Sequence, residues 1–142
     1  MTENDGMLGE TRFAPTRTVL IVEDSEQSAA PLEMAAGHIP GVAVLVASSG
    51  IEALRILSDA TRNVCLVVTD LNMPRMDGFE LIERIRADAR FGRLPIIVVS
   101  ADTDPATPAR IGRLGADAFF AKPYSPAQVC RKLEQLLDAA TH

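Results

Sequence analysis

VCLVVTDLNMPRMDG, residues 64–78, joins an apolar run to a turn and sets one carboxylate, Asp70, at the junction. The run of apolar residues before Asp70 predicts a strand that is buried on both faces. Pro74 and Gly78 mark the turn that follows. Because open α/β sheets bind ligands at the carboxyl ends of their strands, we expect Asp70 to lie in a functional site.

A second apolar run, from Thr18 to Val22, leads directly into Glu23 and Asp24. If the two strands are neighbours, three carboxylates meet at one edge of a sheet. Oxygen ligands with no His or Cys nearby favour Mg²⁺ or Mn²⁺ over zinc. The alternative is that Glu23 and Asp24 only cap the helix that follows.

The rest of the chain alternates between strand-like and helix-like patterns. Apolar runs predict further strands over residues 42–46, 95–100 and 118–121. Helices are predicted from Ser25, over residues 51–57, 79–85 and about 105–114, and from Ser125 or Pro126 onward. Pro31 removes a backbone donor, so the first helix is expected to kink or to begin near it.

Five strands that alternate with five helices predict a single α/β domain, a doubly wound parallel sheet with helices on both faces. In the flavodoxin-like order 2-1-3-4-5 the first strand lies beside the third, so Glu23 and Asp24 adjoin Asp70. Ser100 ends the fourth strand and Lys122 ends the fifth. These polar groups then share one rim of the sheet.

Length and composition narrow the class of protein. A chain of 142 residues that is 47% hydrophobic fits one domain with a substantial core. We expect residues 1–17 to be a flexible tail and residues 18–140 to form the domain. The net charge of −5 argues against a nucleic-acid partner. The sequence has no apolar stretch long enough to cross a bilayer. Cys65 and Cys130 do not have the spacing of metal ligands, so we expect reduced thiols in a cytoplasmic protein.

Three carboxylates, a hydroxyl and an ammonium at one rim are the groups that a phosphorylatable aspartate needs. Asp70 would be the nucleophile toward phosphorus, while Glu23 and Asp24 would hold Mg²⁺. Lys122 would supply a fixed positive charge, and Ser100 would donate a hydrogen bond to a phosphoryl oxygen.

The sequence resembles the receiver domain of bacterial response regulators, the chemotaxis-regulator-like proteins of two-component signalling. The resemblance covers roughly Arg17 to Ala139. Its motifs are Val22-Glu23-Asp24, Asp70 to Gly78, Ser100-Ala101, Gly115-Ala116-Asp117 and Lys122-Pro123. It implies a phosphoprotein in phosphorelay signal transduction and not an enzyme that turns over external substrates.

By this resemblance, Asp70 accepts a phosphoryl group from a sensor histidine kinase or a histidine phosphotransfer protein. The phosphorylated domain then binds an output protein that the sequence does not identify. The backbone carbonyl of Asn72 joins the Mg²⁺ ligands. Ser100 and Phe119 form a switch, in which Ser100 turns toward the phosphoryl group and Phe119 swings inward, and Pro123 follows a cis peptide bond.

The resemblance also places Asn72 and Asp102 beside the path of the water that would hydrolyse phosphorylated Asp70. Both side chains are short, and an acid at position 102 can orient that water, so rapid dephosphorylation is expected. The alternative is that Asp102 only begins the loop after Ser100 or caps the next helix.

Three function classes follow. Because the residues after Lys122 suffice for one helix, we expect a stand-alone receiver without an output domain. The second hypothesis is a receiver cut from a hybrid kinase or a larger regulator. The third is an aspartate-nucleophile phosphatase, which normally needs an acid two residues after the nucleophile, where this chain has Asn72. Pairing of phosphorylated copies into a homodimer stays open, because only some receivers pair.

Overall fold

The computed structural model describes residues 16–140, and within them five strands form one sheet in the order β2-β1-β3-β4-β5. The strands are β1 (Arg17–Val22), β2 (Val42–Ala47), β3 (Val64–Thr69), β4 (Ile96–Ser100) and β5 (Ala118–Ala121). All neighbouring strands run parallel. The predicted doubly wound α/β sheet and its strand order are therefore confirmed.

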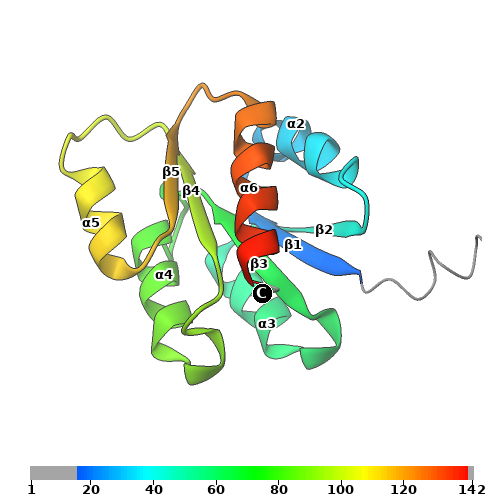
Figure 1. The fold of residues 1–142 in the computed structure, drawn as a ribbon. Coiled ribbons are helices and arrows are strands. Elements are labelled where there is room, and N and C mark those ends of the chain that lie inside the picture. Colours follow the sequence, from blue (N-terminus) through cyan, green and yellow to red (C-terminus); the bar gives the residue numbers. More distant parts are fainter. Residues whose placement is uncertain (1–15, 141–142) are drawn as a thin grey trace, which may run out of the picture.

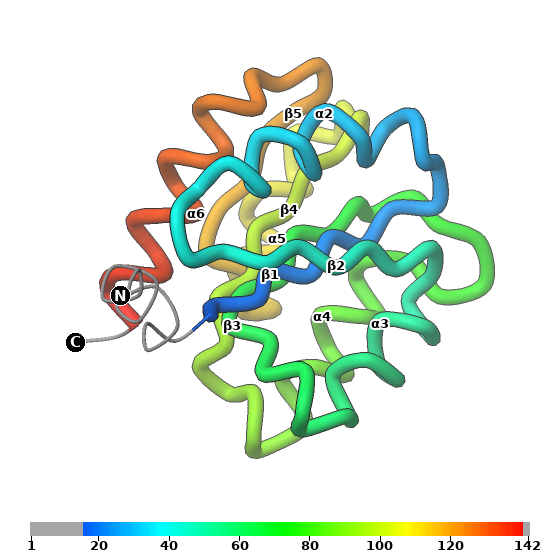
Figure 2. The backbone as a smooth tube through the Cα atoms, turned by 90° about the vertical axis from the view of Figure 1, so that its right-hand side faces the viewer, coloured from blue at the N-terminus to red at the C-terminus, as the bar shows by residue number. Residues whose placement is uncertain are grey.

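Helices follow the strands and cover both faces of the sheet (Figure 1). They are α2 (Glu26–Gly37), α3 (Gly50–Ser58), α4 (Gly78–Ala87), α5 (Thr107–Leu114) and α6 (Pro126–Ala140), with short 3-10 turns η1 (Ala60–Arg62) and η2 (Ala89–Phe91). Helices α2 and α6 lie on one face, and α3, α4 and α5 lie on the other (Figure 2). None of the helices between residues 16 and 140 is long and apolar enough to cross a membrane.

Strand side chains alternate between two cores. In β1, Val19 and Ile21 pack with α2 and α6, whereas Leu20 and Val22 pack with α3, α4 and α5. All four are at most 3% exposed. Burial on both faces explains why the central strands appear in the sequence as uninterrupted apolar runs.

The predicted boundary between tail and domain is wrong by one residue. Arg17, which the sequence analysis assigned to the tail, is the first residue of β1, and its amide donates a hydrogen bond to the Gly41 carbonyl at 2.9 Å. Such backbone pairing leaves no mark in the side-chain pattern. Residues 1–15 of the predicted tail lie outside the described part of the chain.

Of two predicted helix starts, one is confirmed and the other differs from the structure. Helix α2 begins at Glu26, capped by Ser25, whose hydroxyl accepts the Ser28 amide at 3.3 Å. The start predicted at Ser25 is therefore confirmed, and because the helix runs on through exposed Pro31, the alternative of a start near Pro31 is wrong. Helix α5 begins at Thr107 and not near residue 105, because turns formed by aspartate side chains occupy the residues before it.

The first turn of α4 is built onto the loop that carries Asp70. Asp77 caps the helix by accepting the Glu80 amide at 2.9 Å. The Gly78 amide donates to the Leu71 carbonyl at 2.8 Å. A Cβ atom at position 78 would lie 2.7 Å from Leu71 Cα and would also clash with the Asp70 carbonyl. Only glycine allows this close approach.

Replacing Gly78 by alanine should therefore destabilise the protein by about 2 kcal/mol or more, because backbone and not a flexible side chain must move. The matched control is Gly112→Ala in α5, where an added Cβ meets nothing within 4 Å. That variant should be neutral or up to about 1 kcal/mol more stable. Urea denaturation measures both free energies of unfolding, and equal stability of the two variants would contradict the packing described for Gly78.

Candidate functional site

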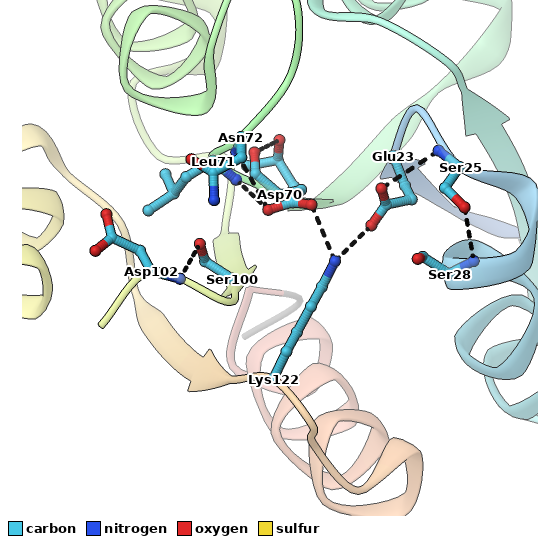
Figure 3. Close-up of polar contacts among 10 residues, drawn as sticks. Glu23, Ser25, Ser28, Asp70, Leu71, Asn72, Ser100, Asp102 and Lys122 are labelled. Atoms are coloured by element: carbon cyan, nitrogen blue, oxygen red, sulfur yellow. Dashed lines mark hydrogen bonds and ion pairs between the residues drawn. The ribbon is translucent and has the colours of Figure 1, made fainter. Parts of the chain in front are cut away.

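The carboxyl ends of four strands bring the predicted site residues together (Figure 3). Glu23 and Asp24 follow β1, Asp70 follows β3, Ser100 ends β4, and Lys122 follows β5. Backbone hydrogen bonds continue beyond the strands, from the Asp70 amide to the Val22 carbonyl and from the Lys122 amide to the Ser100 carbonyl. The sheet itself therefore fixes the spacing of the site.

Lys122 bridges two carboxylates. Its Nζ lies 2.9 Å from Glu23 Oε1 and 2.9 Å from Asp70 Oδ2. The side chains of Glu23 and Asp70 are only 6% and 8% exposed, and the side chain of Lys122 is 23% exposed. Two buried acids therefore share one largely buried cation. A buried carboxylate needs such pairing, because desolvation opposes its charge.

The burial of these groups shifts their pKa values. Burial raises the pKa of Glu23 above its usual range, although the hydrogen bond from Lys122 opposes the shift. For Lys122, burial lowers the pKa, but the hydrogen bonds to Glu23 and Asp70 outweigh it, so the pKa rises. Lys122 therefore stays protonated at neutral pH.

The second oxygen of Asp70 is held by backbone amides. Asp70 Oδ1 accepts the Leu71 amide at 2.7 Å and the Asn72 amide at 3.3 Å. With Oδ2 on Lys122, both oxygens are oriented by fixed donors. Thr69 also contributes, because its buried hydroxyl donates to the Asp70 carbonyl at 2.8 Å. No role for Thr69 is predicted from the sequence, although a hydroxyl just before the acid at a strand end is a usable signal.

Three carboxylates form a group that can hold a metal ion. One oxygen each of Glu23, Asp24 and Asp70 lies within 4.8 Å of the others. Asp24 is exposed and makes no hydrogen bond among residues 16–140. The carbonyl of Asn72 likewise accepts no hydrogen bond from that part of the chain. Such an oxygen-only donor set fits a small hard cation such as Mg²⁺.

Ser100 is completely buried beside this group. Its Oγ accepts the Asp102 amide at 3.1 Å, and within the described residues no acceptor takes its hydroxyl proton. The Asp102 carboxylate points away from Asp70 (Figure 3). Asp102 Oδ1 accepts the Asp104 amide at 2.8 Å. Asp102 thus helps to build the loop after β4.

Two further predicted residues flank Lys122. Phe119 on β5 is half-buried and packs against the core that α3, α4 and α5 cover. The peptide bond between Lys122 and Pro123 is cis. Pro123 is exposed, and Tyr124, beyond it, packs against the core under α2 and α6.

Comparison with known proteins gives one family. The response regulator receiver domain family matches residues 19–134. The chemotaxis protein CheY1 of Helicobacter pylori is 31% identical over 119 residues, which are 84% of this chain and 95% of that protein. The two-component response regulator ORR3 of Oryza sativa is 34% identical over 94 residues, which are 66% of this chain and 71% of that one.

Solved structures agree. A response regulator receiver protein from Pseudomonas putida is 32% identical, with a TM-score of 0.75 over 89% of this chain and 98% of its own. Chemotaxis protein CheY4 of Vibrio cholerae is 26% identical, with a TM-score of 0.75 over 85% and 98%. The chain belongs to the response regulator receiver domain family. Receivers of this type are signalling proteins that interact with histidine kinases and downstream targets, and not true enzymes.

Lys122→Met should destabilise the metal-free protein by about 3 kcal/mol at pH 8, because it leaves two buried carboxylates without their cation. The deficit should shrink as the pH falls. Without Lys122 the raised pKa of Glu23 rises further, so folding binds a proton and is favoured at lower pH.

Urea denaturation in EDTA at several pH values measures this loss. Lys132→Met is the matched control, since the Lys132 ammonium bonds only to Gln135 on the exposed side of α6 within the described residues. Equal stability of Lys122→Met and Lys132→Met at pH 8 would contradict the bridging role of Lys122.

Proposed function

We propose that Asp70 is the phosphoacceptor of this receiver domain and that its phosphorylation controls binding to another protein. One observation carries the proposal. Lys122 holds Asp70 and Glu23 in a single buried group, and one carboxylate oxygen of Asp24 lies within 4.8 Å of an oxygen of each of these acids. A nucleophilic carboxylate, metal-binding acids and a fixed ammonium are the components of phosphoryl transfer to aspartate.

In the proposed step, one Asp70 carboxylate oxygen attacks phosphorus and an acyl phosphate bond forms. The bond from phosphorus to the donor breaks, and the donor is a phosphohistidine of a sensor kinase or of a histidine phosphotransfer protein. The histidine leaves with the electron pair and takes up a proton. The amides of Leu71 and Asn72 keep Asp70 oriented for attack along the line opposite the leaving group.

We propose that Glu23, Asp24, Asp70 and the Asn72 carbonyl hold Mg²⁺, or Mn²⁺ in its place. The ion would neutralise the phosphoryl oxygens as charge develops on them. Lys122 is then free to leave one carboxylate and to contact a phosphoryl oxygen, since its ammonium has three donors.

Ser100 and Phe119 are the proposed switch. The Ser100 hydroxyl, which has no acceptor within residues 16–140, would donate to a phosphoryl oxygen, and half-buried Phe119 would move inward. The changed surface would bind the output protein. We propose a cytoplasmic setting for these partners, and the free thiols of Cys65 and Cys130 are compatible with it.

Asn72 and Asp102 are proposed to tune how long the phosphoryl group survives. The Asn72 side chain is exposed next to the acid, so it can bind the attacking water without excluding it. For Asp102 the contribution requires release of its carboxylate from the loop, because Oδ1 is bound to the Asp104 amide.

Labelling by acetyl phosphate tests the phosphoacceptor. The wild-type protein should gain one phosphoryl group in Mg²⁺, and EDTA should abolish the gain, because without the metal ion the carboxylates repel the negatively charged phosphoryl oxygens. Asp70→Asn should reduce labelling to background by intact mass, since the amide is not a nucleophile toward phosphorus.

The control is Asp59→Asn, which changes an exposed aspartate in the cap of η1 after α3, away from the carboxyl ends of the strands. It should label as the wild type does. Labelling of Asp70→Asn at the wild-type level, or labelling that EDTA leaves unchanged, would overturn the assignment.

A further inference from the structure

The loop between β4 and α5 contains a short chain of hydrogen bonds that ends at Ser100. The Thr107 hydroxyl donates to Asp102 Oδ2 at 3.1 Å, and the Asp102 amide donates to Ser100 Oγ at 3.1 Å. The other carboxylate oxygen accepts the Asp104 amide at 2.8 Å. Asp102 is therefore held from three directions.

Thr107 is built into the fold at the first residue of α5. It is 4% exposed, and its hydroxyl makes no other hydrogen bond within the described residues. The cap residue of this helix, Ala106, has no side-chain oxygen to offer. Thr107 thus fastens the loop to the helix through Asp102, and a buried hydroxyl paired with a carboxylate is costly to leave unpaired.

We propose that Thr107 is a positioning residue for the phosphoacceptor site, acting through Asp102 to hold Ser100 in its present rotamer. The inference rests on the proposed function, since it concerns the movement of Ser100. When Ser100 turns toward a phosphoryl group, its Oγ leaves the Asp102 amide. While Thr107 and the Asp104 amide hold the carboxylate, Asp102 cannot follow.

Because Asp102 is anchored, the turn of Ser100 breaks the hydrogen bond from the Asp102 amide and leaves it unreplaced. That hydrogen bond is present only in the unphosphorylated state, so it shifts the two populations toward that state by its own contribution. The contact with Thr107 also keeps the Asp102 carboxylate away from water that approaches Asp70. Thr107, which is buried at the start of α5, thus influences the rate at which Asp70 is phosphorylated.

Thr107→Val removes the hydroxyl and keeps the buried shape. The rate of Mg²⁺-dependent labelling by acetyl phosphate should rise at least about threefold, because a released Asp102 can move with Ser100, and Ser100 then turns without losing its hydrogen bond from the Asp102 amide. Thr107→Ser should restore the wild-type rate. The matched control is Thr103→Val, an exposed threonine of the same loop with no hydrogen bond among residues 16–140, and it should label as the wild type does.

A double-mutant cycle separates positioning from a general loss of packing. In an Asp102→Ala background, Thr107→Val should change the labelling rate no further, because the partner is already gone. An unchanged rate in Thr107→Val, or the same increase with and without Asp102, would overturn the proposal.

Amide hydrogen exchange in unphosphorylated protein provides a second readout. Exchange at Asp102 and Asp104 should accelerate severalfold in Thr107→Val and stay unchanged in Thr103→Val. If the wild-type protein fails to label at all, the proposed function is wrong. The exchange rates then still decide whether Thr107 holds Asp102, and unchanged exchange would refute that as well.

Discussion

The contact of one ammonium group with two buried carboxylates is the interaction on which the site depends. Lys122 Nζ lies 2.9 Å from both Glu23 Oε1 and Asp70 Oδ2. Without that cation, desolvation and mutual repulsion would drive one acid to take up a proton. Because Lys122 pairs them, the charges needed to receive a metal ion and a phosphoryl group are already assembled. Under the proposed function, phosphorylation changes the partners of Lys122 and leaves the sheet unchanged.

The parallel sheet makes this contact achievable between residues far apart in the chain. Glu23 and Lys122 are separated by 99 positions, yet both follow strands whose carboxyl ends meet at one rim. Val22 pairs with Thr69, and Ser100 pairs with Ala121, so Ser100 lies at a paired position and Glu23, Asp70 and Lys122 lie one step beyond one. Gly78 lets the first turn of α4 pack directly against the loop that carries Asp70, because it has no Cβ atom to clash with that backbone.

The sequence predicted the fold and the membership of the site because both arise from local patterns. Buried strands appear as apolar runs, and strand-end acids stand out at their ends. It failed where a partner is chosen by tertiary structure. Arg17 joins β1 through its backbone, and α5 begins later than predicted because aspartate side chains form turns before it. The role of Thr107 depends on a loop conformation that no side-chain pattern encodes.

Under the proposed function, the strand-end acids, Ser100 and Lys122 act together on one phosphoryl group. Beryllofluoride, a phosphoryl mimic, added with Mg²⁺ to the isotopically labelled protein and followed by amide NMR tests it most directly. We expect the Asp70, Ala101 and Lys122 amides to shift together at one equivalent of the mimic, and no shift when Mg²⁺ is omitted. Shifts confined to another part of the surface, or none at saturating Mg²⁺ and mimic, would contradict the claim.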